Sequence, residues 1–192
     1  GARIVFVTVA SNLKDTSPFK SQHTSGLGAA ACARSETLAT KARHARERGD
    51  AESATQLARE IVELDPRWAA GHYECGRALF DARSYEESHA EFQRAMDEDV
   101  CPLRQLTVMR EVMLEVAARD RAPVVDFVKI CEDTMLRRYG HRIAGQELFL
   151  DHAHPTVEGN GILAVALVQA LITAGVVHPG VDWQERAMPK AS

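Results

Sequence analysis

Cysteine is scarce in this sequence and is never paired at a metal-binding spacing. The four cysteines, Cys32, Cys75, Cys101 and Cys131, lie far apart, and no two form a Cys-x-x-Cys motif. The spacing argues against a structural zinc site, and so few thiols do not build a disulfide scaffold. Buried, reduced thiols are the expected state, which favours the cytoplasm. No other feature of the sequence bears on the compartment.

Basic blocks and long apolar runs are also missing. The net charge is -4, so nucleic acid is not expected as a partner. The longest apolar run, Ile162 to Ile172, contains Gln169 and is too short to cross a bilayer. It predicts a buried helix and no membrane span. The first residues, Gly1 to Val9, lack the pattern of a secretory signal and resemble the middle of a domain.

Two patterns typical of buried strands are present. Arg3 to Ala10 is a continuous β-branched and aromatic run, and Ala122 to Phe127 is a second, shorter one. Runs that are apolar on both faces suit central strands of a parallel sheet. Helical spacing precedes the second run, from Leu106 to Ala118, and follows it, from Val128 to Tyr139. This alternation predicts an α/β layer fold.

Residues 29–104 separate these patterns and have a helical composition. Two stretches are similar at a spacing of 34 residues, with Ala54 opposite Ser88 and Ile61 opposite Ala95. This resembles the tetratricopeptide (TPR) repeat, which implies two antiparallel helices per unit. Two units seldom stand alone, so we expect them to lean on the rest of the chain. They would form either a surface for a protein or peptide partner or an inserted helical lid.

Candidate catalytic side chains occur in two loops. Asp151 and His154 lie in the turn between a short apolar run and the last helix, and this pair is typical of a base and the group that orients it. Asn12 follows the first predicted strand, at the end where parallel sheets bind ligands. The alternatives are structural, with Asn12 capping a turn and Asp151 capping the last helix.

A metal site is a competing interpretation of the same turn. His152 and His154 would point to one side of an extended stretch and could bind zinc together with Asp126 or Asp151. No further histidine lies at a convincing position. We therefore predict neither a metal nor a cofactor.

Both loops also resemble blocks of one enzyme family. The run from Thr8 to Asp15 is similar to the asparagine block of the SGNH (GDSL-type) serine hydrolases, and the run from Phe149 to Gly159 is similar to their Asp-x-x-His block. The resemblance implies a partial three-layer αβα parallel-sheet domain of the α/β class, with an inserted all-α TPR-like region. It implies that His154 is the base, that Asp151 orients it and that Asn12 is an oxyanion donor. Arg104, where the chain leaves the helices, could bind an anionic group of the substrate.

The family's Gly-Asp-Ser block is missing, and with it the serine nucleophile. We therefore expect the C-terminal part of a serine ester hydrolase or O-acyl transferase, inactive alone, whose parent acts on an ester or acylated small molecule or glycan. The alternative is a TPR protein-binding module with a non-catalytic α/β scaffold. The expected organisation is a strand and Asn loop at 1–28, helical repeats at 29–104, the Asp-x-x-His segment at 105–180 and a tail at 181–192.

Overall fold

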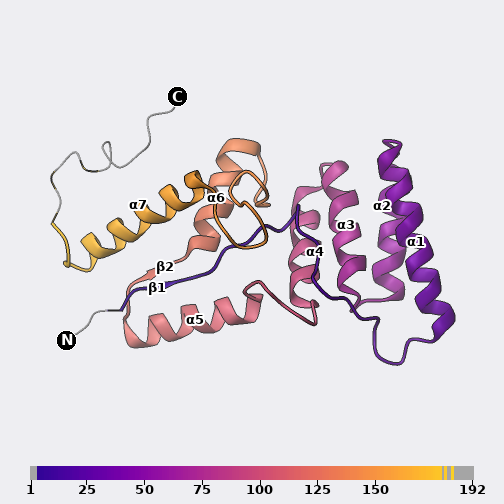
Figure 1. Ribbon diagram of the computed structural model, residues 1–192, viewed down its shortest axis with the longest axis horizontal. Coiled ribbons are helices and arrows are strands. Elements are labelled where there is room, and N and C mark those ends of the chain that lie inside the picture. Colours follow the sequence, from indigo (N-terminus) through magenta and orange to yellow (C-terminus); the bar gives the residue numbers. More distant parts are fainter. Residues whose placement is uncertain (1–3, 179, 181–182, 184–192) are drawn as a thin grey trace.

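Helices dominate the molecule. The computed structural model describes residues 4–178, 180 and 183, and within these it has seven helices and two short strands (Figure 1). The predicted tail at 181–192 lies outside the described residues except for Trp183. The elements are β1 (Phe6–Val7), α1 (Ala29–Glu47), α2 (Ala51–Leu64), α3 (Ala69–Asp81), α4 (Tyr85–Asp97), α5 (Thr107–Asp120), β2 (Val124–Val125), α6 (Phe127–Tyr139) and α7 (Val157–Thr173).

The predicted three-layer αβα sheet domain is wrong. The only sheet in the described part of the chain has two parallel strands, in which Phe6 pairs with Val124 and Val7 with Val125. The run from Arg3 to Ala10 was expected to be one long strand, but its partner is only two residues long. Asp126 follows at once and caps α6, with its side chain accepting a hydrogen bond from the N–H of Lys129. A ladder this short cannot form the middle layer of an α/β domain.

The first four helices pack side by side, with α2 between α1 and α3 and with α4 against α3 (Figure 1). Their core is rich in alanine. Of the positions matched at a spacing of 34, Ala54, Ser88, Ile61 and Ala95 are buried, whereas the matched Pro66 and Val100 are exposed. Gly76 allows α3 to approach α4 closely, since a Cβ atom there would lie 2.8 Å from Cδ1 of Phe92. The internal similarity thus corresponds to equivalent buried positions in two helical hairpins.

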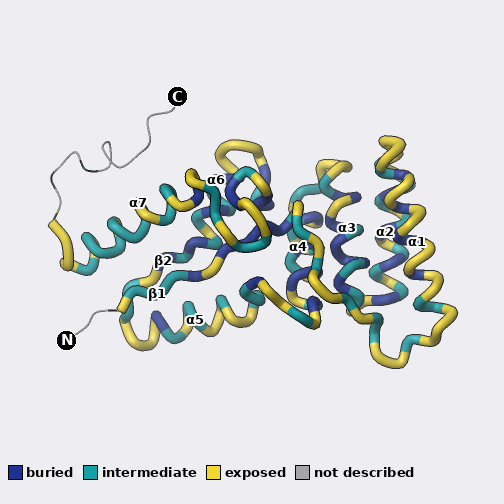
Figure 2. The backbone as a smooth tube through the Cα atoms, viewed as in Figure 1, coloured by how far each residue is buried: buried dark blue, intermediate teal, exposed yellow. Residues whose placement is uncertain are grey.

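The short sheet has a core of its own, formed with α6 and α7. Val125 and the α6 residues Phe127, Cys131 and Met135 are buried there, and the apolar side chains of α7 pack against them. Helix α6 ends at Tyr139 and is followed by Gly140, where φ is +75° and the N–H donates to the carbonyl of Leu136, as expected for a glycine C-cap. In Figure 2 dark blue gathers in α3, in α4 and in the part of the molecule between α4 and α6.

Helix α5 differs from the other helices because much of its apolar surface is exposed. Ala117 is its one buried residue, whereas Val108, Met109 and Val112 are each more than half exposed. In Figure 2 this helix is mainly yellow and teal along its length. Among the described residues no helix combines the length and apolar character needed to cross a bilayer.

Candidate functional site

The turn that carries Asp151 and His154 is closed by main-chain hydrogen bonds. The N–H of Leu150 donates to the carbonyl of His154 at 2.8 Å, and the N–H of Thr156 donates to that of Leu148 at 2.9 Å. Thr156 then caps α7, because its hydroxyl accepts a hydrogen bond from the N–H of Gly159. The backbone of the turn is therefore held on both of its sides.

Asp151 and His154 contact each other directly. Nδ1 of His154 lies 2.8 Å from Oδ2 of Asp151, and Oδ1 of Asp151 accepts the N–H groups of His154 and Ala153, each at 2.9 Å. These two main-chain donors, and then the imidazole, hold the pKa of Asp151 well below its usual range. An ionised Asp151 keeps the proton on Nδ1, so Nε2 of His154 is free to accept one. The His154 side chain is 75% exposed, which leaves Nε2 accessible.

Asn12 lies beside this turn. Its N–H donates to the carbonyl of His152 at 3.1 Å, so the loop after β1 and the Asp–His turn are neighbours in space. The Oδ1 atom of Asn12 accepts the N–H of Asp15 at 2.9 Å, and the residue is only 1% exposed. No hydrogen bond within the described part of the chain uses its Nδ2 group. The loop that carries Asn12 is thus held against the Asp–His turn, and the side chain of Asn12 is buried there.

Arg104 is buried and binds the main chain of the Asn12 loop. Its guanidinium donates to the carbonyl of Asn12 at 3.0 Å and to that of Thr16 at 3.1 Å. Burial lowers the pKa of Arg104 below its ordinary value, while nearby Asp99 acts in the opposite direction. This geometry makes Arg104 a positioning residue for the loop, and its expected role in binding an anionic substrate stays a prediction.

Further contacts, which the sequence does not indicate, hold the same loop in place. Lys14 forms an ion pair with Glu147 at 2.7 Å, and Asp15 accepts the N–H of Gln146 at 2.9 Å. The hydroxyl of Tyr73, from α3, donates to the carbonyl of Lys14 at 2.8 Å. Lys14 and Asp15 lie two and three residues after Asn12, but nothing in the sequence indicates that residues 146 and 147 would meet them.

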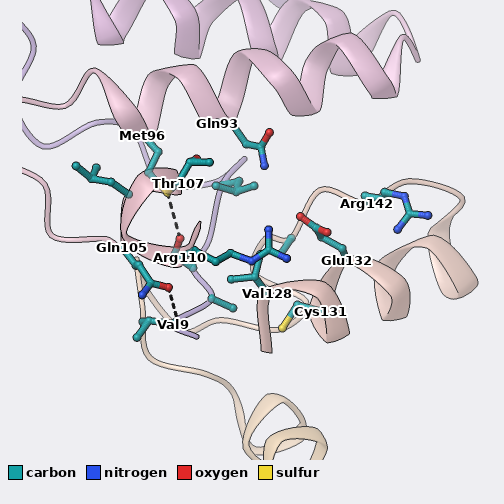
Figure 3. Close-up of a pocket in the computed structure, with 15 residues that line it drawn as sticks. Val9, Gln93, Met96, Gln105, Thr107, Arg110, Val128, Cys131, Glu132 and Arg142 are labelled. Carbon is teal, nitrogen blue, oxygen red and sulfur yellow. Dashed lines mark hydrogen bonds between the residues drawn. The ribbon is translucent and has the colours of Figure 1, made fainter. Parts of the chain in front are cut away.

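A pocket lies at the junction of the two cores, on the side of the loop formed by residues 9–13. Its cavity volume is about 40 Å³, and it is lined by α4, the start of α5 and α6. Figure 3 shows Gln93, Arg110, Glu132 and Arg142 among its lining residues. None of the residues that line it belongs to the turn with His154. The pocket and the Asp–His pair are therefore separate features.

The alternative zinc site is not formed. The carboxylate of Asp126 accepts two hydrogen bonds from Arg110, at 3.0 and 2.7 Å, and a third from the hydroxyl of Thr8. His152 and His154 have ring centroids 6.2 Å apart. Across residues 4–178, 180 and 183, no group of three or more histidine, cysteine, aspartate or glutamate side chains is placed to hold a metal ion.

No protein-family model, curated protein or solved structure matches this chain. The inferred membership of the SGNH (GDSL-type) hydrolases, with inserted TPR repeats, is therefore wrong, and the two-stranded sheet excludes the fold of that family. The helices of residues 29–97 form hairpins with a repeated pattern of burial, but they carry no family assignment. A protein or peptide partner for these helices stays a prediction.

Proposed function

We propose that the Asp151–His154 turn and the Asn12 loop form half of a site that hydrolyses or transfers an O-acyl ester. The observation that carries this proposal is the 2.8 Å hydrogen bond between Nδ1 of His154 and Oδ2 of Asp151, with Nε2 exposed. The other half is a serine hydroxyl nucleophile. In the described part of the chain, no hydroxyl or thiol hydrogen-bonds to His154, so the chain alone would have little activity.

Each residue has a defined part in this chemistry. Nε2 of His154 takes the proton of the attacking hydroxyl and returns it to the leaving oxygen, while Asp151 stabilises the imidazolium. The substrate carbonyl oxygen gains negative charge as the nucleophile adds, and Nδ2 of Asn12 donates a hydrogen bond to it. Arg104 holds the Asn12 carbonyl and so keeps this donor in place. The substrate class is an ester or an acylated small molecule or glycan.

Acetyl transfer to a small alcohol tests this proposal, because the alcohol replaces the missing nucleophile. The chain is incubated with 4-nitrophenyl acetate and glycerol, and acetylglycerol is measured. In a complete active site, an acid–base group accelerates the reaction roughly 10²–10⁴-fold. We expect the exposed His154 to accelerate acetyl transfer by about tenfold. His154→Ala should remove this gain. His152→Ala is the matched control, since its ring lies 3.8 Å from Asp151 and makes no such hydrogen bond.

The oxyanion role of Asn12 needs a variant that leaves the loop intact. Asn12→Asp keeps an oxygen to accept the N–H of Asp15 but removes the Nδ2 donor. We expect it to lower acetyl transfer by about tenfold, below the roughly 10²–10³ seen when buried oxyanion donors are lost. If His154→Ala and His152→Ala reduce the rate equally, while circular dichroism shows that both are folded, the assignment of His154 is wrong.

A further inference from the structure

Two buried carboxylates occupy equivalent positions in the two helical hairpins. Asp65 directly follows α2, Asp99 lies two residues after α4, and their spacing of 34 residues is that of the internal similarity. Their exposed fractions are 0% and 6%. Within residues 4–178, 180 and 183, no ion pair joins either carboxylate to a lysine or an arginine. A buried carboxylate of this kind needs hydrogen-bond donors, so its donors identify what each hairpin binds.

Asp99 binds the first part of a short segment, residues 19–24. Its carboxylate accepts the N–H groups of Phe19 and Lys20, at 2.6 and 3.0 Å, and the N–H of Val100 donates to the carbonyl of Lys20 at 3.0 Å. Apart from a bend at Phe19 the segment has no regular structure. In Figure 1 it belongs to the indigo chain that passes along one end of the hairpins before α1. This end of the second hairpin therefore binds peptide groups of a non-helical chain.

Asp65 binds the last part of the same segment and adds side-chain recognition. Its carboxylate accepts the N–H of Thr24 at 2.8 Å and the hydroxyl of Thr24 at 2.7 Å. It also lies 2.5 Å from Nδ1 of His23, and the other ring nitrogen of His23 lies 3.4 Å from Glu36. Because carboxylates face both ring nitrogens, the geometry suits an imidazolium cation, which donates from both.

Polar contacts, and not apolar packing, hold this segment on the hairpins. Phe19, its largest apolar side chain, is 68% exposed. A cavity of about 300 Å³ remains between the segment and the hairpins, lined by residues 22–25, by Arg67 and by residues 97–100. The segment therefore does not complete the hydrophobic core of the hairpins, and a chain that offers the same donors can take its place.

We propose that the ends of α2 and α4 form a binding site for a basic, non-helical peptide segment, and that residues 19–24 occupy it as a built-in ligand that a partner protein's segment replaces. The charges are complementary, since residues 97–99 are all acidic, whereas the built-in ligand carries Lys20 and His23 and no acidic residue. The partner segment should follow the same order, with a basic residue and, three positions later, His-Thr. The built-in ligand competes at a high effective concentration, so the native chain should bind such a segment only weakly.

Fluorescence anisotropy with a labelled peptide tests this proposal. The probe is the blocked peptide Ser-Pro-Phe-Lys-Ser-Gln-His-Thr-Ser-Gly, which copies residues 17–26. The protein is the full chain with His23→Ala and Thr24→Pro, which remove the donors that Asp65 accepts from the built-in ligand. We expect the peptide to bind this double variant about tenfold more tightly than the native chain. The same peptide N-methylated at Phe, Lys and Thr lacks the main-chain donors and should bind about tenfold more weakly.

Asp99→Asn in the double variant tests the site itself. It removes the charge that accepts two successive N–H groups, and we expect it to weaken peptide binding by about tenfold. Asp81→Asn is the matched control. Asp81 is also an aspartate at the end of a helix, but α3 runs antiparallel to α2 and α4, so Asp81 lies at the opposite end of the hairpins. Its replacement should leave peptide binding unchanged.

Three outcomes would overturn the proposal. They are no binding to the double variant at millimolar peptide while circular dichroism shows native helix content, equal binding by the Asp99→Asn and Asp81→Asn variants, and a native dimer in sedimentation that Asp99→Asn abolishes. The dimer would identify a second copy of the chain as the source of the segment. His23→Ala alone replaces the double variant if the latter loses helix content. None of these measurements depends on acyl transfer, so this proposal and the proposed function can fail independently.

Discussion

Replacing Gly76 with alanine should destabilise the protein even though alanine favours helix. Gly76 lies within α3, where exchanging glycine for alanine typically gains about 1 kcal/mol. The new Cβ atom, however, would lie 2.8 Å from Cδ1 and 3.0 Å from Cε1 and Cγ of Phe92. Ordinary contact begins near 3.4 Å, so the ring would have to move by several tenths of an ångström.

Phe92 has little room for that movement. It is 1% exposed and packs against Tyr73, with ring centroids 5.6 Å apart. Overpacking of such a core typically costs about 1–3 kcal/mol. The higher helix propensity of alanine offsets about 1 kcal/mol of this packing cost. We therefore expect Gly76→Ala to lower the free energy of unfolding by about 1 kcal/mol, and by about 2 kcal/mol if α4 cannot shift.

Gly161 provides the matched control. It lies within α7, and a Cβ atom there would meet nothing within 4 Å. Gly161→Ala should therefore stabilise the protein, by about 0.5–1 kcal/mol. Urea unfolding followed by circular dichroism measures both variants, and Phe92→Leu in the Gly76→Ala background should recover part of the loss. The packing argument is refuted if Gly76→Ala and Gly161→Ala stabilise the chain alike.

Two other predictions concern titratable groups. Burial acts to lower the pKa of His23, but its hydrogen bonds to Asp65 and Glu36 outweigh burial and raise that pKa. The His23–Asp65 pair, at 2.5 Å, should therefore stabilise the fold fully below the unfolded histidine pKa of about 6.5 and lose this effect as pH rises through the folded value. The difference in Tm between the native chain and His23→Gln should then narrow as the pH is raised, and a constant difference would contradict the assignment. Burial raises the pKa of Cys75 and of Cys131 to about 12, so a thiol reagent should modify Cys32 and Cys101 first, and the other two only after unfolding.

Local features of the fold could be predicted from the sequence. The helix expected from Val128 to Tyr139 is α6, which begins one residue earlier and has Gly140 as its C-cap. The last helix, α7, is capped by Thr156, and not by Asp151 as the structural alternative expected. Each of these features depends on residues within a few positions of one another. The hydrogen bond between Asp151 and His154 is local in the same way, since one turn separates them.

The sheet could not be predicted in this way. The run from Arg3 to Ala10 has the composition of a long central strand, but the length of a ladder depends on its partner as well. Asp126 ends that partner after two residues by starting α6. The contacts of Arg104 and Tyr73 with the Asn12 loop join residues far apart in the sequence, and no spacing pattern indicates them.

These distant contacts connect the helical hairpins mechanically to the loop that carries Asn12. Tyr73 belongs to α3 and Arg104 follows α4. Both donate hydrogen bonds to main-chain carbonyls of that loop. A molecule that tilted α3 or α4 on binding would move the loop through these hydrogen bonds. The position of Asn12 relative to the Asp–His turn would then change. Occupancy of the hairpins and chemistry at the turn would then be linked energetically, each changing the other by the same free energy.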